Sequence, residues 1–193
     1  MNIEITDSYI PGTILKKSDI GVTGLEFLDK LFFLSDGIML NQIREIAGLD
    51  SSTIQNWVKR GWLGNTVHKQ YSKMQLARLL IINMLRSTMK LEKIDFLLHY
   101  INGNLDSRLD DIIPEPVLFD YICRIIDRLE EGGGLADCAR LREVIAEITD
   151  GYVERLEGAM NRLRNALEII IISYHASVVA AYSDERFKEL KGE

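Results

Sequence analysis

Apolar residues recur at intervals of three and four along most of the chain, which predicts helices rather than strands. In the segment 24–35, Leu25, Leu28, Leu31, Phe32 and Leu34 share one such face. A second helix is predicted over 39–47, and Gly48 directly after it is typical of a helix C-terminus. Further helices are predicted at about 74–87, 91–101, 116–131, 136–149 and from Tyr152 toward Leu190. The pattern predicts an all-α chain.

The segment 49–63, LDSSTIQNWVKRGWL, predicts a short helix three residues after Gly48. Ser51 or Ser52 is suited to its N-cap, and Ile54, Trp57 and Val58 fall on one inner side. Two short helices joined by a Gly-containing turn form a helix-turn-helix pattern. The next segment, WLGNTVHKQYS (62–72), is broken by Gly and Asn, and it predicts a small hairpin or loop in the position of a wing.

A domain boundary is predicted after the helices that follow the wing. Ser72 and Gln75 form a capping box that opens the first of these helices. The acidic segment LDSRLDDIIPEP (105–116), which contains two prolines, resembles a linker. The predicted division is an N-terminal segment with one helix at 1–39, a winged helix-turn-helix at 40–104, and a helical dimerisation or effector region at 105–193.

Charge is distributed unevenly along the chain. The formal net charge is −6, which by itself disfavours a nucleic-acid partner. Residues 40–90, however, hold eight Lys or Arg against two Asp or Glu, a balance of +6. Residues 1–39 carry −3 and residues 91–193 carry −9. The basic region coincides with the helix-turn-helix pattern, which favours DNA as its partner.

The outward face of the helix in 49–63 carries side chains suited to reading DNA. Gln and Asn pair bidentately with adenine, Ser bonds a base edge or a phosphate, and Lys neutralises a phosphate. The alternative is an ordinary solvated polar face. For Trp57 and Trp62 we prefer core packing and anchoring of the wing to base stacking. The candidates for DNA contact are Ser52, Gln55, Asn56, Lys59 and Arg60 on the helix, His68, Lys69 and Tyr71 in the wing, and Lys73.

The last predicted helix carries a heptad seam across three heptads. The alternative is a helix packed inside its own domain, and both hold if the helix packs on its own domain and on a second subunit. A homodimer would present two reading heads to a two-fold operator. The predicted dimerisation residues are Val153, Leu156, Met160, Leu163, Leu167, Ile170 and Tyr174.

Enzymatic chemistry finds little support in the sequence, and no cofactor or metal is expected. The chain has no phosphate-cradling Gly loop, and His68, His99 and His175 have no partners at metal-ligand spacing. Cys123 and Cys138 are expected to be core thiols. The start of the chain does not resemble a secretory signal. The apolar run 166–182 falls short of about 20 residues, so we expect a buried helix, no membrane span and a reduced cytoplasmic protein.

The pieces IREIAG, STIQNWVKRGWL, HKQYS, MQLARLLIINMLRS and LEKIDFLLHYI resemble, in order and spacing, the MerR-type winged helix-turn-helix. The chain is also similar, over about 10–131, to a bacterial domain-of-unknown-function family numbered eighteen thirty-six. The MerR resemblance implies a regulator that binds double-stranded DNA as a dimer. It implies base contacts from the reading helix and backbone contacts from the wing, through Thr53, Gln55, Asn56, Lys59, Lys69 and Tyr71.

We therefore expect a bacterial transcription regulator, all-α with a small β wing, that binds a two-fold operator as a homodimer. A small-molecule or protein effector would be sensed beyond residue 105, in an enclosed pocket among the C-terminal helices. The main alternative is a protein-interaction module with a winged fold that does not bind DNA. Ion pairs that tie the basic side chains back to the acidic regions would favour this alternative.

Overall fold

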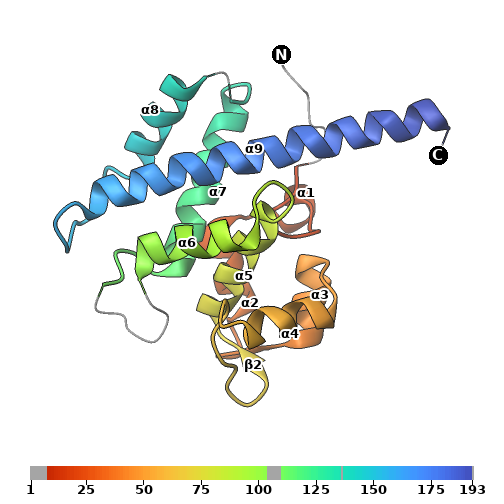
Figure 1. The fold of residues 1–193 in the computed structure, drawn as a ribbon, viewed down its shortest axis with the longest axis vertical. Helices are drawn as coiled ribbons and strands as arrows, with labels where there is room; N and C mark the ends of the chain where they lie inside the picture. The colour runs from red at the N-terminus through yellow and green to blue at the C-terminus, as the bar shows by residue number, and fades with distance from the viewer. Residues whose placement is uncertain (1–7, 104–109, 136, 193) are drawn as a thin grey trace.

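The computed structural model describes residues 8–103, 110–135 and 137–192 (Figure 1). Helices dominate these residues, and two short strands form the one antiparallel sheet that they contain. The elements are α1 (Lys17–Ile20), α2 (Gly24–Leu31), β1 (Ile38–Met39), α3 (Leu40–Ala47), α4 (Ser51–Lys59), β2 (Gln70–Tyr71), α5 (Lys73–Leu85), α6 (Leu91–Asn102), α7 (Glu115–Glu131), α8 (Cys138–Ile148) and α9 (Ala159–Lys191). The mainly-α prediction is confirmed.

Helix α5 is the centre of the core. Its residues from Leu76 to Leu85 are buried all round, apart from the half-buried Asn83. Helices α3, α6, α7 and α9 all pack against α5, so it lies between the head formed by α3, α4 and the sheet and the C-terminal helices. The predicted capping box opens α5: Gln75 N donates to Ser72 Oγ, and Ser72 N donates to Gln75 Oε1.

The two short helices α3 and α4 and the turn between them form where the pattern predicts them. Gly48 ends α3 in the left-handed conformation with φ of 66°, which Gly adopts at no steric cost. The N-cap of α4 is Asp50, without a side-chain cap bond, so the prediction of Ser51 or Ser52 was wrong by one position or more. Ile54 and Trp57 are buried, and Val58 packs partly against the core.

The sheet differs from the predicted wing. Strand β2 pairs with β1, which precedes α3, and Tyr71 lies opposite Ile38. Because β1 has only two residues, no alternating pattern could reveal it, and the sequence did not predict this strand. An isolated bridge from Val67 to Gln70 encloses a two-residue turn at His68 and Lys69.

The first predicted helix is shorter than expected. Helix α2 ends at Leu31, and the extension to Leu34 was wrong. Phe33 and Leu34 consequently lie outside the helix with 83% and 91% of their surface exposed. The other end of the fold is arranged around α7, which packs against α2, α5, α8 and α9. The predicted division at residue 105 stays a prediction.

Helix α9 begins at Ala159, so its predicted start at Tyr152 was wrong. It runs along the side of the molecule opposite the head, and its C-terminal part extends past the other helices (Figure 1). Its 33 residues make it the one described helix that is long and apolar enough, by length and composition, to cross a membrane. Core helices of soluble proteins meet the same criterion, and here α9 packs on α5, α6, α7 and α8.

Candidate nucleic-acid interface

The outer face of α4 is polar and unengaged. Burial of Ile54 and Trp57 fixes the helical phase, and Ser52, Gln55 and Asn56 are therefore exposed. Their side chains make no hydrogen bond with any described residue, so their donors and acceptors are available to an external partner. Thr53 is half-buried beside them. These residues are thus exposed as predicted, and their contact with DNA stays a prediction.

Two basic residues end α4. Lys59 is exposed and forms no ion pair within the described part of the chain. Arg60 is also exposed, and its guanidinium lies 5.2 Å from the centre of the Trp62 ring. This cation–π contact limits the rotamers of Arg60 while leaving its charge at the surface. Both side chains therefore contribute positive charge beside the polar face.

The wing turn presents two further side chains. His68 and Lys69 are exposed and have positive φ angles of 51° and 62°. Gln70 N donates to the Val67 carbonyl at 2.9 Å, as in a two-residue hairpin turn of the primed type. Such turns favour Asn-Gly, so the backbone of His68 and Lys69 is strained. This pair places a basic side chain at the tip of the turn.

Two predicted contact residues are placed differently. Tyr71 is only 4% exposed because it faces the core opposite Ile38, and burial raises the pKa of its hydroxyl. A DNA contact by Tyr71 is inconsistent with this position. Lys73 Nζ lies 2.6 Å from Asp29 Oδ1 on α2, so its charge is paired within the chain.

Sequence reasoning overlooked the turn between α5 and α6. A cavity of about 430 Å³ separates this turn from α4, and it is lined on one side by Thr53, Asn56 and Trp57 and on the other by Arg86, Met89, Lys90, Leu91 and Glu92. Lys90 is the N-cap of α6, and its side chain makes no cap bond to the first N–H groups of this helix. Arg86 and Lys90 lie in the basic region 40–90, and this positive charge was the sequence feature that could have indicated the turn.

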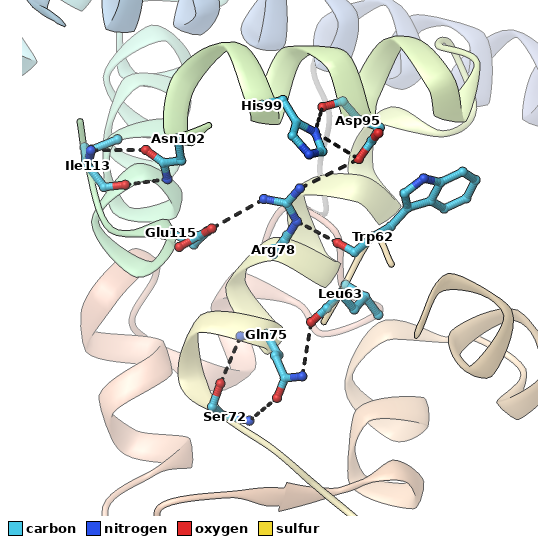
Figure 2. Close-up of polar contacts among 10 residues, drawn as sticks. All are labelled: Trp62, Leu63, Ser72, Gln75, Arg78, Asp95, His99, Asn102, Ile113 and Glu115. Carbon is cyan, nitrogen blue, oxygen red and sulfur yellow. Dashed lines mark hydrogen bonds and ion pairs between the residues drawn. The ribbon is translucent and has the colours of Figure 1, made fainter. Parts of the chain in front are cut away.

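The loop between α4 and the wing is held by α5 (Figure 2). Gln75 Nε2 donates to the carbonyl oxygens of Leu63, Gly64 and Asn65 at 3.1–3.3 Å. Arg78 Nε donates to the Trp62 carbonyl at 2.6 Å. These bonds give hydrogen-bond partners to the loop carbonyls, and they fix the loop to α5.

The same Arg78 connects the head to the helices behind it. Its Nη1 lies 3.4 Å from Glu115 Oε1 on α7, and its Nη2 lies 3.8 Å from Asp95 Oδ1 on α6 (Figure 2). Burial lowers the pKa of Arg78, while Glu115 and Asp95 oppose that shift. Asn102 completes the connection, because its side-chain amide donates to the Ile113 carbonyl and accepts from the Ile113 amide.

A larger cavity, of about 570 Å³, lies beneath the wing. Its walls include Asp36, His68, Gln75, Arg78, Asp111 and Glu115. The pocket that we predicted for an effector was placed among the C-terminal helices, whereas this cavity adjoins the head. Effector binding stays a prediction. Within the described ranges, no group of three or more His, Cys, Asp or Glu residues is arranged to hold a metal ion.

The predicted dimerisation residues do not form one surface. Val153 and Leu156 precede α9 and are exposed, whereas Leu163, Leu167 and Ile170 are fully buried inside the chain. The heptad spacing therefore reports internal packing for these three residues. Cys138 is exposed at the start of α8, which corrects its assignment as a core thiol, while Cys123 is buried as expected.

Comparisons with known proteins support part of the sequence-based resemblance. The family model described as Domain of unknown function (DUF1836) matches residues 25–116, which confirms the resemblance to that family for this part of the chain. The chain is also similar to the "Uncharacterized protein YkrK" of Bacillus subtilis (strain 168), with 28% identity over 134 residues. These cover 67% of this chain and 56% of the relative, so the chain spans little more than half the length of that protein. No solved structure matches.

Proposed function

We propose that residues 40–102 are a DNA-reading head of the MerR-like winged helix-turn-helix type and that the protein regulates transcription. In this proposal α4 enters the major groove, and the wing turn and the α5–α6 turn contact the backbone on either side. One observation carries the proposal: the polar face of α4 is exposed and unengaged while basic residues flank it on both sides.

The chemistry of each position follows from its side chain. Gln55 and Asn56 have the amide geometry for adenine N6 and N7, and Ser52 bonds either a base edge or a phosphate. Lys59 and Lys69, together with Arg86 and Lys90, neutralise phosphates, and each such contact releases counterions and makes affinity depend on salt. The first N–H groups of α6 add a site for one backbone oxygen.

The test is fluorescence anisotropy on the DNA upstream of its own coding sequence and on a scrambled duplex, over a range of salt concentrations. We expect Gln55→Ala to lose discrimination worth about 1–3 kcal/mol while retaining nonspecific affinity. Lys69→Ala and Lys90→Ala should each reduce the salt slope by about one ion. Asn161→Ala and Arg155→Ala, both exposed on the C-terminal side of the molecule, are the matched controls and should change neither quantity.

Absence of binding to the upstream DNA would be followed by selection from genomic fragments, because an operator can lie elsewhere. If no duplex binds even at low salt, the DNA proposal is wrong. An equal loss in the Arg155→Ala control would likewise contradict it, since that loss would indicate a nonspecific charge effect.

A protein-interaction module is the second candidate, and two observations favour it. The pairing of Lys73 with Asp29 withdraws one positive charge from the base of the wing. Phe33, Leu34 and Val67 are large apolar residues that are 83%, 91% and 69% exposed around the sheet. Such residues are suited to the desolvated centre of a protein interface. Loss of partner capture on Phe33→Ser, with DNA binding absent from the unmodified protein, would establish this candidate.

A further inference from the structure

The cavity beneath the wing has a buried floor and an exposed mouth. Its volume of about 570 Å³ is within the range of small-molecule pockets in proteins. Leu63, Arg78 and Glu115 are buried and form the floor, whereas Asp36 and His68 are exposed and form the mouth. A molecule that enters beside the wing therefore reaches side chains of residues that are at most 4% exposed.

Glu115 supplies an acceptor at the floor that the chain leaves without a partner. Its side chain extends from the start of α7 toward Arg78 on α5, and both residues line the cavity (Figure 2). Oε1 of Glu115 lies 3.4 Å from Arg78 Nη1, while Oε2 is buried and has no hydrogen-bond partner among the described residues. A buried carboxylate oxygen without a donor is costly, so a ligand N–H group that reaches Oε2 forms a charge-assisted bond.

Arg78 neutralises Glu115 only in part. Their separation exceeds the distance of about 2.7–2.9 Å that is typical of strong charge-assisted pairs. Nη2 of Arg78 lies 3.8 Å from Asp95 on α6, which is not among the lining residues, and Nε donates to the Trp62 carbonyl. Because one guanidinium is shared among these groups, the floor of the cavity retains negative charge.

The cavity is acidic as a whole. Asp36, Asp111 and Glu115 line it, and Arg78 is the one Lys or Arg among its described lining residues. Three carboxylates against one guanidinium give a formal balance of −2. A concave surface with an excess of one sign of charge attracts ligands of the opposite sign. The cavity therefore favours a cation over an anion.

The carboxylates are distributed around the cavity. One precedes β1, one precedes α7, and one lies in the first turn of α7. Within the described ranges, no group of three or more acidic, His or Cys side chains is arranged to hold a metal ion, so a single point charge does not suit this site. Apolar side chains of Leu63, Val67 and Met74 line the same cavity. Separated negative charges with apolar surface are complementary to a chain of methylenes that carries more than one ammonium group.

We propose that this cavity is a binding site for a linear aliphatic diamine or polyamine. One ammonium group donates to Glu115 Oε2 at the floor, a second interacts with the Asp36 carboxylate at the mouth, and the methylenes contact Leu63 and Met74. An ammonium group suits the floor because it has three donors and no acceptor. The proposal goes beyond DNA binding and does not depend on it.

The first experiment is isothermal titration calorimetry of the full chain, without DNA, with putrescine and with spermidine. We expect one saturable site per chain with a Kd below about 1 mM. n-Butylamine has the same four carbons as putrescine and a single ammonium group, and it should bind about tenfold more weakly. Hexamethonium has two quaternary nitrogens without N–H groups and should not bind, because it cannot donate to Glu115.

Three variants test the assigned contacts. Glu115→Gln should raise the Kd of putrescine by about tenfold or more, because it removes the buried charge at the floor. Asp36→Asn should raise it by about two- to fivefold, because an exposed carboxylate is screened by water. Asp150→Asn is the matched control: it removes the same charge from an exposed residue outside the cavity and should leave the Kd unchanged. Circular dichroism checks that each variant is folded.

Hydrogen–deuterium exchange locates the ligand even if Glu115→Gln does not fold. Putrescine should slow exchange of backbone amides in residues 63–70 and at the start of α7, and it should leave α9 unchanged. The proposal is wrong if neither amine gives saturable binding, if hexamethonium binds as tightly as putrescine, or if the protection lies elsewhere. An equal loss in Asp150→Asn would also contradict it, since that loss indicates attraction to the acidic surface in general. None of these measurements contains DNA, so their failure is distinguishable from failure of the DNA proposal.

Discussion

Arg78 on α5 and Glu115 at the start of α7 form an ion pair of 3.4 Å in which the two side chains are only 3% and 5% exposed. The residues are 37 positions apart, and their pairing connects the head to the C-terminal helices. The same guanidinium also donates a hydrogen bond to the Trp62 carbonyl and lies 3.8 Å from the Asp95 carboxylate. The wing and α7 are thus positioned by one buried cation.

We expect Glu115→Ala to lower the free energy of unfolding by about 3 kcal/mol or more, because a buried guanidinium loses its nearest carboxylate. The double variant Arg78→Met/Glu115→Leu should lose less than the two single changes predict together. Urea denaturation measures each value. Arg128→Ala removes only exposed ion pairs with Glu131 and Glu147 and should stay within about 0.5 kcal/mol. Additive losses in the double variant would contradict a coupled pair.

Gly12 is required by a close approach as well as by its backbone conformation. Its φ is +75°, and a Cβ at this position would lie 2.2 Å from the carbonyl oxygen of Leu80 on α5. Gly21 has nearly the same φ, +74°, and open space around it. We expect Gly21→Ala to cost about 1 kcal/mol from conformation alone and Gly12→Ala roughly 1–3 kcal/mol more from displacement. Equal melting temperatures for the two variants would show that the contact is unimportant.

Lys69 in the wing turn is expected to lower the stability of the fold, because a non-glycine residue there adopts the left-handed conformation. Lys69→Gly removes a non-glycine residue from the left-handed region and should stabilise the fold by up to about 1 kcal/mol. If Lys69 contacts a phosphate as proposed, the same change should weaken DNA binding and reduce its salt dependence. Thermal melts and anisotropy together test both effects. Lys69→Ala should weaken binding without the gain in stability.

His175 on α9 is expected to make stability fall in mild acid. Burial lowers the pKa of this histidine, while Glu130 partly offsets the shift, and Nε2 has no hydrogen-bond partner among the described residues. The unfolded chain therefore binds a proton at a higher pH than the folded one. The stabilising effect is present above the unfolded pKa of 6.5 and is lost as pH falls through the folded value.

The slope that one such proton causes cannot exceed about 1.4 kcal/mol per pH unit. Urea denaturation between about pH 7.5 and 5 measures it, given the ordinary histidine pKa near 6.5. We expect His175→Asn to flatten this decline. His68→Asn, at an exposed site in the wing turn, is the matched control and should retain it. An unchanged slope in the His175 variant would assign the decline to other groups.

The sequence by itself determined the position of most helices and much of the head. Ile54 and Trp57 fix the phase of α4, Gly48 fixes the turn before it, and Ser72 with Gln75 fixes the start of α5, because each signal is local to a few residues. The exposed face of Gln55 and Asn56 follows from that phase. These features needed no knowledge of which segments meet in space.

Only the tertiary structure decided which residues distant in sequence are neighbours. Tyr71 carries the same local pattern as a wing contact residue, but its pairing with Ile38 turns it into the core. The sequence alone also favoured Lys73 as a phosphate ligand, but in the fold Asp29 of α2 pairs with its ammonium group. In α9, a heptad spacing cannot distinguish packing on the same chain from packing on a second copy. The body buries one face of this helix and leaves the opposite face free, and that choice depends on long-range packing that no periodicity contains.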